Sequence, residues 1–230
     1  KILICGGDGT LNHFINEVDT DNITNEVYYY PTGSGNDFIN DLGRKASDGP
    51  VKINEYIVNL PVCKVNNKEY KFINGIGYGI DGYCCEEGDR IRVTSNKRVN
   101  YTSIALKGLM YKYKPTNATV TADGVTKAYK NVWIAPTMNG RYYGGGMMPT
   151  PDQKRLEEDK HVTNMVFYGT GKIKTILIFP KIFTGAHVKY TKHAALHRCK
   201  NIKVEFDRPV ALQVDGETIL DVTCYEVSVK

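Results

Sequence analysis

Two glycine-rich loops, each between a short apolar run and a helical pattern, constrain the fold of this chain more than any other feature. The first loop, residues 6–10, follows the apolar run 1–5, and the second loop, residues 31–37, follows the apolar run 27–30. After each loop, apolar residues recur at the spacing of a helix. Strand–loop–helix units in series are typical of a parallel sheet covered by helices. We therefore predict an α/β unit over residues 1–56.

After Tyr56 the pattern is typical of antiparallel β structure. Strand-like runs flank two hairpin turns, Asn66-Asn67-Lys68 and Asp123-Gly124, and Asp-Gly is one of the strongest short hairpin signals. Helical patterns interrupt the strands at residues 96–113 and 172–179. We predict a β-rich second domain over residues 57–230, joined near Tyr56 without a flexible linker.

Composition limits the class of protein. The 230 residues are 41% hydrophobic, which is enough for a core, and the formal charge is only +5. Without a run of Lys and Arg, this charge predicts no nucleic-acid partner and fits a phosphate ligand or a membrane surface equally well. No apolar stretch approaches the roughly 20 residues of a transmembrane helix, and no leader is recognisable.

The six cysteines match neither a disulfide framework nor paired zinc-binding motifs. We therefore expect free thiols and a cytoplasmic protein. The first residues already read as a buried strand that leads into a glycine loop, so we also expect the chain to start inside a fold.

The glycine loops carry the chemistry that the sequence suggests. A glycine loop between a strand and a helix presents backbone N–H groups to an anion at the positive end of the helix, although glycine also serves any tight turn. Asp8 suits a phosphate whose charge is shared with Mg²⁺, and Asp37 has the alternative role of a helix N-cap. A shared Mg²⁺-nucleotide site explains both loops at once.

Five motifs in order resemble one family. They are GGDGTLN at residues 6–12, PTGSGNDF at 31–38, NGIGYG at 74–79, NGRYYGGG at 139–146 and VDGE at 214–217. Together they are similar to the diacylglycerol kinase catalytic domain family, which includes sphingoid-base kinases and bacterial soluble lipid kinases and is related to NAD kinases. The resemblance covers nearly the whole chain.

The resemblance implies an α/β plus β fold. A phosphofructokinase-like nucleotide domain, here partial and lacking its N-terminal part, would occupy residues 1–56, and an antiparallel β-sandwich would occupy residues 57–230, with a last strand that could return to the first domain. ATP and Mg²⁺ would bind between the two. The implied ATP-site residues are Gly6, Gly7, Asp8, Gly9, Thr10, Leu11, Asn12, Gly33, Ser34 and Asp37.

The carried-over acidic residues have distinct expected roles. Asp8 and Asp37 would belong to the Mg²⁺ network of the nucleotide. Glu217 is our first choice as the base that takes the proton of the substrate hydroxyl, with Asp215 as the second candidate, although Asp215-Gly216 also reads as a hairpin turn. Glu158 or Asp159 would hold a structural Mg²⁺ near the position of a KLDDG segment in the family, and a solvated acidic turn is the alternative role of this segment.

Two departures from the family concern activity. The strand–helix portion that precedes GGDGT in the family is not in this sequence, and Asn59 stands where the family has an Asp that feeds the Mg²⁺ network. One negative charge fewer would weaken that network.

The expected function is an ATP-dependent lipid kinase that phosphorylates a lipid alcohol, diacylglycerol first. The alternatives are a kinase of a sphingoid base, phosphatidylglycerol or NAD, and a catalytically impaired lipid-binding regulatory module. The expected partners are a lipid substrate at the inner face of a membrane and a second copy of the chain. Helix 96–113, with Lys97, Arg98, Lys107 and Lys112 among apolar residues, is a candidate membrane contact, and core packing is its alternative role.

Overall fold

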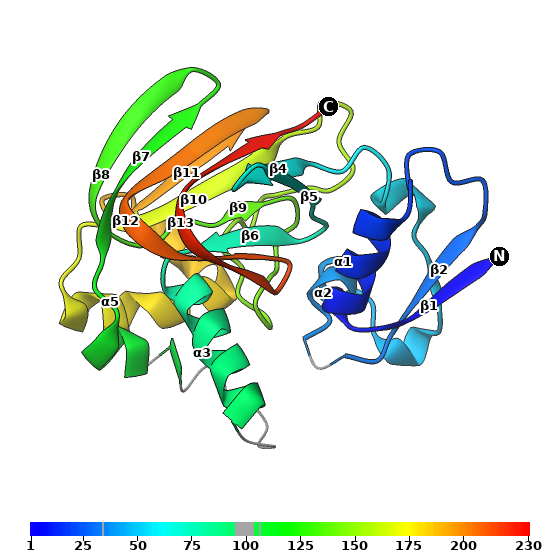
Figure 1. Ribbon diagram of the computed structural model, residues 1–230, viewed down its shortest axis with the longest axis horizontal. Coiled ribbons are helices and arrows are strands. Elements are labelled where there is room, and N and C mark those ends of the chain that lie inside the picture. Colours follow the sequence, from blue (N-terminus) through cyan, green and yellow to red (C-terminus); the bar gives the residue numbers. More distant parts are fainter. Residues whose placement is uncertain (34, 95–103, 106) are drawn as a thin grey trace.

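The first residues form a small three-stranded sheet. The computed structural model describes residues 1–33, 35–94, 104–105 and 107–230. Strand β1 (Ile2–Gly6) pairs in parallel with β2 (Val27–Pro31), and β3 (Val51–Lys52) pairs with β2 in the antiparallel sense. The parallel pair brings the two glycine loops to the same edge of the sheet, as the sequence predicts (Figure 1).

Two helices cover this sheet and fill its core. Helix α1 (Asp8–Glu17) contributes Leu11 and Ile15, and α2 (Asp37–Asp41) contributes Phe38. Short 3₁₀ turns, η1 (Ala46–Asp48) and η2 (Asn54–Tyr56), lead out of the unit. Ile73, which lies beyond the expected boundary at Tyr56, packs into the same core. The first sheet and the following segment therefore share hydrophobic packing.

The remaining strands form one large antiparallel sheet that folds back on itself. Its order is β5-β4-β13-β12-β6-β9-β10-β8-β7, and β11 pairs with β10. The long strand β12 pairs along one stretch with β7 and along another with β6, so the sheet curls into a barrel-like sandwich (Figure 1). The strands are β4 (Val62–Val65), β5 (Lys68–Lys71), β6 (Gly75–Tyr78), β7 (Thr116–Ala122), β8 (Val125–Ile134), β9 (Thr137–Met138), β10 (Val162–Tyr168), β11 (Ala194–Cys199), β12 (Asn201–Val214) and β13 (Glu217–Ser228).

Both predicted hairpins are present, between β4 and β5 and between β7 and β8, and the α/β plus β fold class is confirmed. The last strand does not return to the first unit, because β13 pairs with β12 and β4. All six cysteines are free thiols.

Helices pack on one side of the large sheet. They are α3 (Ile80–Thr94), η3 (Gly108–Lys112), α5 (Lys172–Ile178), η4 (Phe179–Thr184) and η5 (Ala186–Lys189). The helix predicted at 172–179 is confirmed as α5 and the start of η4, whereas α3 was not expected. Of the helix predicted at 96–113, residues 96–103 and 106, with Lys97 and Arg98, lie outside the described residues.

Within the described ranges, no helix has the length and apolar character needed to cross a bilayer.

Candidate active site

The two glycine loops touch each other. The Thr32 N–H donates to the Gly6 carbonyl over 2.8 Å, which holds the second loop against the end of β1. A Cβ atom on Gly33 would lie 2.5 Å from Gly7 Cα, closer than real Cβ contacts allow. Glycine at position 33 is therefore required by close backbone approach. Ser34, expected beside it, lies outside the described residues.

The Asp8 carboxylate links the first loop to the second and to the sandwich. It accepts hydrogen bonds from the backbone N–H groups of Asp37 (2.9 Å) and Phe38 (3.0 Å), at the start of α2. It also accepts one from Asn74 Nδ2 over 3.1 Å, from the loop before β6. A carboxylate at a helix N-terminus satisfies free N–H groups there. Asp8 thus fixes three segments of the site.

Asp37 binds a third glycine loop. Its two carboxylate oxygens accept hydrogen bonds of 2.8 Å each from the backbone N–H groups of Gly145 and Gly146. Gly144, Gly145 and Gly146 all have positive φ angles, which glycine adopts at little cost. Asp37 is only 4% exposed, and burial, aided by the nearby Asp8 charge, raises its pKa to about 6 against the effect of these N–H donors.

The Asp8 and Asp37 carboxylates face the same short segment. A Cβ atom on Gly35 would lie 3.5 Å from Asp8 Oδ2 and 3.9 Å from Asp37 Oδ2. Over the described ranges, neither carboxylate forms an ion pair with Lys or Arg, and no group of three or more His, Cys, Asp or Glu side chains could hold a metal ion. Two carboxylates alone would leave most of the coordination sphere of Mg²⁺ to other oxygen ligands, such as those of a phosphate or of water.

Asp215 lies at the hairpin between β12 and β13 and is fully occupied by donors. Its carboxylate accepts from the N–H groups of Ile73 (2.6 Å), Asn74 (2.9 Å) and Gly75 (2.9 Å) and from Asn12 Nδ2 (3.2 Å). Burial raises the pKa of Asp215, and these hydrogen bonds oppose that shift. Asp215 therefore holds the loop before β6 and ties it to α1.

Glu217, two residues further on, is exposed. The hairpin that carries it is fixed by Asp215 and by the Gly216 N–H, which donates to Gln213 Oε1 over 2.6 Å. Glu217 is thus carried on a hairpin turn that hydrogen bonds hold in place, with its side chain open to solvent.

The other residues that we expected to line the nucleotide site differ in their exposure to solvent. Gly9 and Thr10 are exposed at the start of α1, and Gly7 is half-buried. Leu11 is fully buried in the core of the first sheet, and Asn12 is 3% exposed and bonded to Asp215. Leu11 and Asn12 therefore support the loop from beneath and offer no surface to a nucleotide.

Arg155 joins the two parts of the site and was not singled out from the sequence. Its guanidinium donates to the Asp41 carboxylate on α2, to the Ile73 carbonyl and, over 2.7 Å, to Asn74 Oδ1. The side chain is only 6% exposed and lies 5.0 Å from the Phe38 ring centroid. Buried arginines of this kind are fixed by several acceptors at once.

Asp41 receives a second arginine. Arg141, from the same segment as the third glycine loop, donates to the Asp41 carboxylate over 2.7 Å and to its carbonyl over 2.6 Å. Arg141 lies within the NGRYYGGG motif, and this was the one feature of the sequence that could have indicated its contact with Asp41.

The expected structural metal site at Glu158 and Asp159 does not fit a metal ion. Asp159 is 76% exposed, and its carboxylate forms an ion pair of 2.5 Å with Lys200, which lowers its pKa. Glu158 is exposed beside it. In this segment, the positive charge that contacts the site is the Arg155 guanidinium, which pairs with Asp41.

Asn59 lies away from the acidic pair. Its N–H donates to Asp21 Oδ1 over 2.7 Å, and its carbonyl accepts from Lys160. The expectation that Asn59 weakens a network around Asp8 and Asp37 is not supported by these contacts.

A further buried carboxylate, Asp81, lies at the start of α3. Asp81 is 5% exposed, and Tyr143 from the third glycine loop donates to its Oδ2 over 2.8 Å. Its Oδ1 is buried and accepts no hydrogen bond of good geometry from the described residues. Burial raises the pKa of Asp81 to about 6, against the opposing effect of the Tyr143 hydroxyl.

The fold and the site define a class of protein in which a glycine-loop α/β unit contacts an antiparallel sandwich through a set of carboxylates. Residues 74–228 match the family described as the YegS C-terminal NAD kinase beta sandwich-like domain, and residues 1–62 match the diacylglycerol kinase catalytic domain. The chain belongs to the first of these families, and the second match confirms the resemblance seen in its motifs.

Individual relatives agree with this assignment. "Putative lipid kinase YtlR" from Bacillus subtilis is 26% identical over 166 residues, which are 66% of this chain and 53% of the relative. "Diacylglycerol kinase" from Mycobacterium tuberculosis is 23% identical over 211 residues, 89% of this chain and 66% of the relative. The chain thus spans between about half and two thirds of the length of these relatives.

A solved structure shows the same fold. "Crystal structure of a putative diacylglycerol kinase from Bacillus anthracis str. Sterne" superimposes with a TM-score of 0.66 at 20% identity, over 98% of this chain and 73% of that chain.

Proposed function

We propose that this chain is part of an ATP-dependent lipid kinase that transfers the γ-phosphate to the hydroxyl of a lipid alcohol, with diacylglycerol as the first substrate to test. One observation carries the proposal: the two touching glycine loops place Asp8 and Asp37 together, and hydrogen bonds through Asn74 connect them to the hairpin of Glu217. The names of the relatives support a lipid as the acceptor.

Backbone N–H groups and a metal ion would share the binding of the nucleotide. Gly7 and Gly9, beside the positive end of α1, would approach the phosphates, and Gly33 allows the second loop to come equally close. Asp8 and Asp37 would hold Mg²⁺, which when bound neutralises charge on the phosphates. Burial is the main cause of the raised pKa of Asp37 and the Asp8 charge adds to it, so a bound cation would favour the charged form that the site otherwise disfavours.

Glu217 is the proposed base. Its exposed carboxylate has room to accept a proton from a substrate hydroxyl, whereas four donors occupy Asp215. Asp215 then acts as a positioning residue that fixes the hairpin. The proposed location is the cytoplasmic face of a membrane, where the lipid substrate is available.

The test is transfer of labelled γ-phosphate from Mg²⁺-ATP to diacylglycerol in mixed micelles, with a sphingoid base, phosphatidylglycerol and NAD as alternative acceptors. The complete gene product is assayed beside the 230-residue chain. We expect labelled phosphatidic acid, and we expect Glu217→Gln to lower kcat at least 100-fold while the thermal midpoint stays unchanged. Label in NAD alone, or in no acceptor with the complete gene product, would refute the lipid-kinase proposal.

A further inference from the structure

One outer face of the sandwich domain exposes large apolar side chains. Tyr111 on η3 is 78% exposed, and Ile173 and Leu177 on α5 are 80% and 68% exposed. Thr175 and Ile178 bury the other side of α5, so Ile173 and Leu177, four residues apart, share its outward side. We call Tyr111, Ile173, Leu177 and the lysines of these two segments the α5 face.

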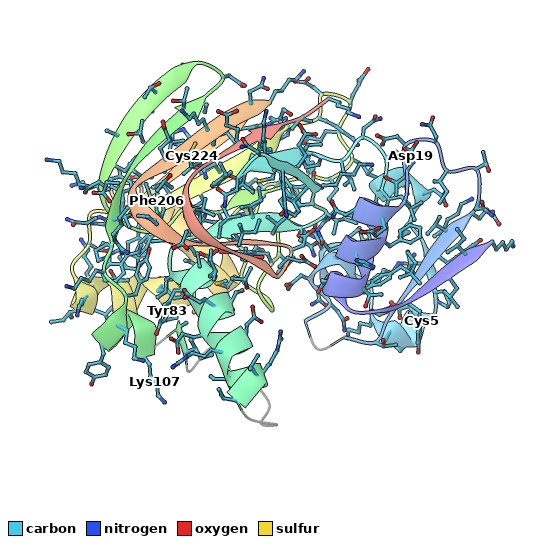
Figure 2. The ribbon with its side chains drawn as sticks, in the orientation of Figure 1. Cys5, Asp19, Tyr83, Lys107, Phe206 and Cys224 are labelled. Carbon is cyan, nitrogen blue, oxygen red and sulfur yellow. The ribbon has the colours of Figure 1, made fainter. Side chains whose placement is uncertain are left out.

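The exposed residues of the α5 face lie on neighbouring elements. Helix α5 packs against η3, and Figure 1 shows both along the same side of the sandwich, far from β1 and β2. Figure 2 places Lys107, just before η3, at this side as well. Singly scattered apolar side chains need no explanation, but a group on adjoining elements marks an interaction surface.

The same two segments concentrate positive charge. Residues 107–114 and 172–192 contain eight lysines and no Asp or Glu, whereas the whole chain has a formal charge of only +5. The lysines are Lys107, Lys112, Lys114, Lys172, Lys174, Lys181, Lys189 and Lys192. The remainder of the chain is therefore net acidic, and the charge of this face is local.

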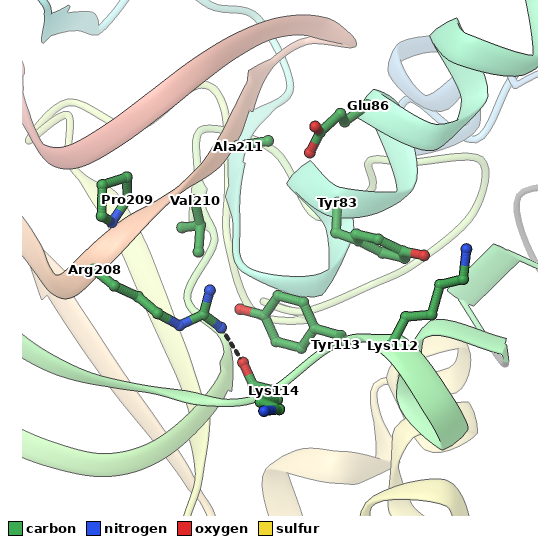
Figure 3. Close-up of a pocket in the computed structure, with 9 residues that line it drawn as sticks. All are labelled: Tyr83, Glu86, Lys112, Tyr113, Lys114, Arg208, Pro209, Val210 and Ala211. Atoms are coloured by element: carbon green, nitrogen blue, oxygen red, sulfur yellow. Dashed lines mark hydrogen bonds between the residues drawn. The ribbon is translucent and has the colours of Figure 1, made fainter.

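A cationic hollow of about 340 Å³ adjoins η3. Lys112, Lys114 and Arg208 line it together with a single carboxylate, Glu86. In Figure 3 the Tyr113 ring lies between Arg208 and Lys112, and Arg208 donates a hydrogen bond to the Lys114 carbonyl. Three cations against one anion suit phosphate groups, which lie at the surface of a phospholipid bilayer.

We propose that the α5 face docks on a bilayer that contains anionic phospholipids, with Tyr111, Ile173 and Leu177 inserted among the headgroups and the lysines at the phosphates. Apolar side chains surrounded by lysines are the composition that binds such an interface. An anionic surface matches the excess of lysines directly, because the two segments carry eight lysines and no Asp or Glu.

A chain of contacts connects this face to the carboxylates of the site. Helix α3 contacts η3, and its first turn holds Asp81, which Tyr143 joins to the loop that binds Asp37. The inference thus rests on the proposed function only for the identity of the lipid substrate, because binding to a bilayer is measured without turnover.

The experiment is flotation of the 230-residue chain with vesicles of phosphatidylcholine alone or with 30% phosphatidylglycerol, at 0.1 M and 0.5 M NaCl. We expect binding to the anionic vesicles at least 10-fold tighter than to the neutral ones, and weaker at high salt. The double variant Ile173→Gln/Leu177→Gln is expected to lower that affinity at least 10-fold. The matched control, Val125→Gln/Leu220→Gln, removes two apolar residues that are 63% and 52% exposed elsewhere and is expected to stay within 2-fold.

A second pair of variants tests the charge. Lys107→Gln/Lys112→Gln/Lys114→Gln is expected to abolish the preference for anionic vesicles, and Lys64→Gln/Lys68→Gln/Lys127→Gln, on exposed strand positions, is expected to keep it. Equal losses in test and control variants would overturn the proposal. So would a dimer without vesicles that dissociates in the Ile173→Gln/Leu177→Gln variant, because that result assigns the face to a second copy. Phosphorylation of a short-chain diacylglycerol that is dissolved as a monomer needs no lipid surface and should be unaffected by these variants, so failed docking and failed kinase activity give different results.

Discussion

Asp81 shows how one buried carboxylate makes stability depend on pH. The pKa of Asp81 in the folded protein is about 6, above its usual value of 3.8. The cost of burying the charged form is therefore absent below about pH 4, grows between pH 4 and 6, and is fully present above pH 6. We expect Asp81→Asn to raise the free energy of unfolding by ~1–3 kcal/mol at pH 7.5 and to change it little at pH 4.

Urea unfolding of wild type and variant across this pH range measures the difference directly. Asp37, whose pKa is also about 6, contributes the same trend to both proteins and cancels in the comparison. Glu86→Gln, on the exposed side of α3, is the matched control and should change the free energy of unfolding by less than about 0.5 kcal/mol at pH 7.5. A difference for Asp81→Asn that is the same at pH 4 and pH 7.5 would show that burial does not raise the pKa of this carboxyl.

Replacing Arg155 should lower the free energy of unfolding more than replacing an arginine at the surface. Three separate acceptors surround its buried guanidinium, and a lysine at this position reaches only part of them. We expect Arg155→Lys to lower the free energy of unfolding by roughly 3 kcal/mol, the usual cost of breaking a buried ion pair. Arg198→Lys, at a 61% exposed ion pair with Glu157, should cost less than about 1 kcal/mol in the same urea titration. Similar losses in both would contradict the role of Arg155.

At the scale of elements, the glycine loops make different demands at different positions. Gly33 has no space for a Cβ atom, whereas a Cβ on Gly9 would meet nothing within 4 Å. We expect Gly33→Ala to separate the two loops, to lower stability by about 1–3 kcal/mol and to weaken nucleotide binding. Gly9→Ala, inside α1, should be neutral or stabilising by up to ~1 kcal/mol. Thermal unfolding and ATP titration of both variants check this, and equal effects would contradict it.

The helices and strands that the sequence predicted are those with a regular spacing of apolar residues and clear turn residues. Both strand–loop–helix units and both tight hairpins follow from period and turn residues. Helix α3 was missed because Gly82 and Gly88 interrupt its pattern and read as breaks. In the structure a Cβ on Gly82 would lie 1.9 Å from the Ala211 carbonyl, so this glycine lets α3 pack closely on β12. A packing requirement of that kind has no local signal.

The long-range contacts of the site could not be predicted from the sequence either, because they too have no local signal. The motifs indicated Asp8, Asp37 and Asp215 as candidates, but Asp41 and Arg155 are 114 residues apart and belong to no shared pattern. The motif for Asp215 also gave no indication that three backbone N–H groups would occupy it. Which carboxylate is bonded and which is exposed depends on the fold, and this distinction separates Asp215 from Glu217.

At the scale of the whole molecule, a ring of hydrogen bonds joins the first sheet to the sandwich. Asn12 on α1 donates to Asp215, Asp215 accepts from the Asn74 N–H, and the Asn74 side chain returns to Asp8 at the start of α1. Asn16 adds a second link, because it exchanges hydrogen bonds of 2.8 and 3.0 Å with the Lys71 backbone. Through these contacts the two parts should unfold as one cooperative unit.

Asp215→Asn tests this coupling, because an amide keeps the shape but can accept at only one oxygen and leaves buried N–H groups unpaired. We expect hydrogen exchange at residues 1–56 to accelerate at least 10-fold, while the strands β7, β8 and β10 keep their protection. Asn16→Ala, which breaks only the outer link, should accelerate exchange in α1 less than 10-fold. If Asp215→Asn instead accelerated exchange evenly in both parts, the carboxylate would support the sandwich itself and the ring would not be what couples the two sheets.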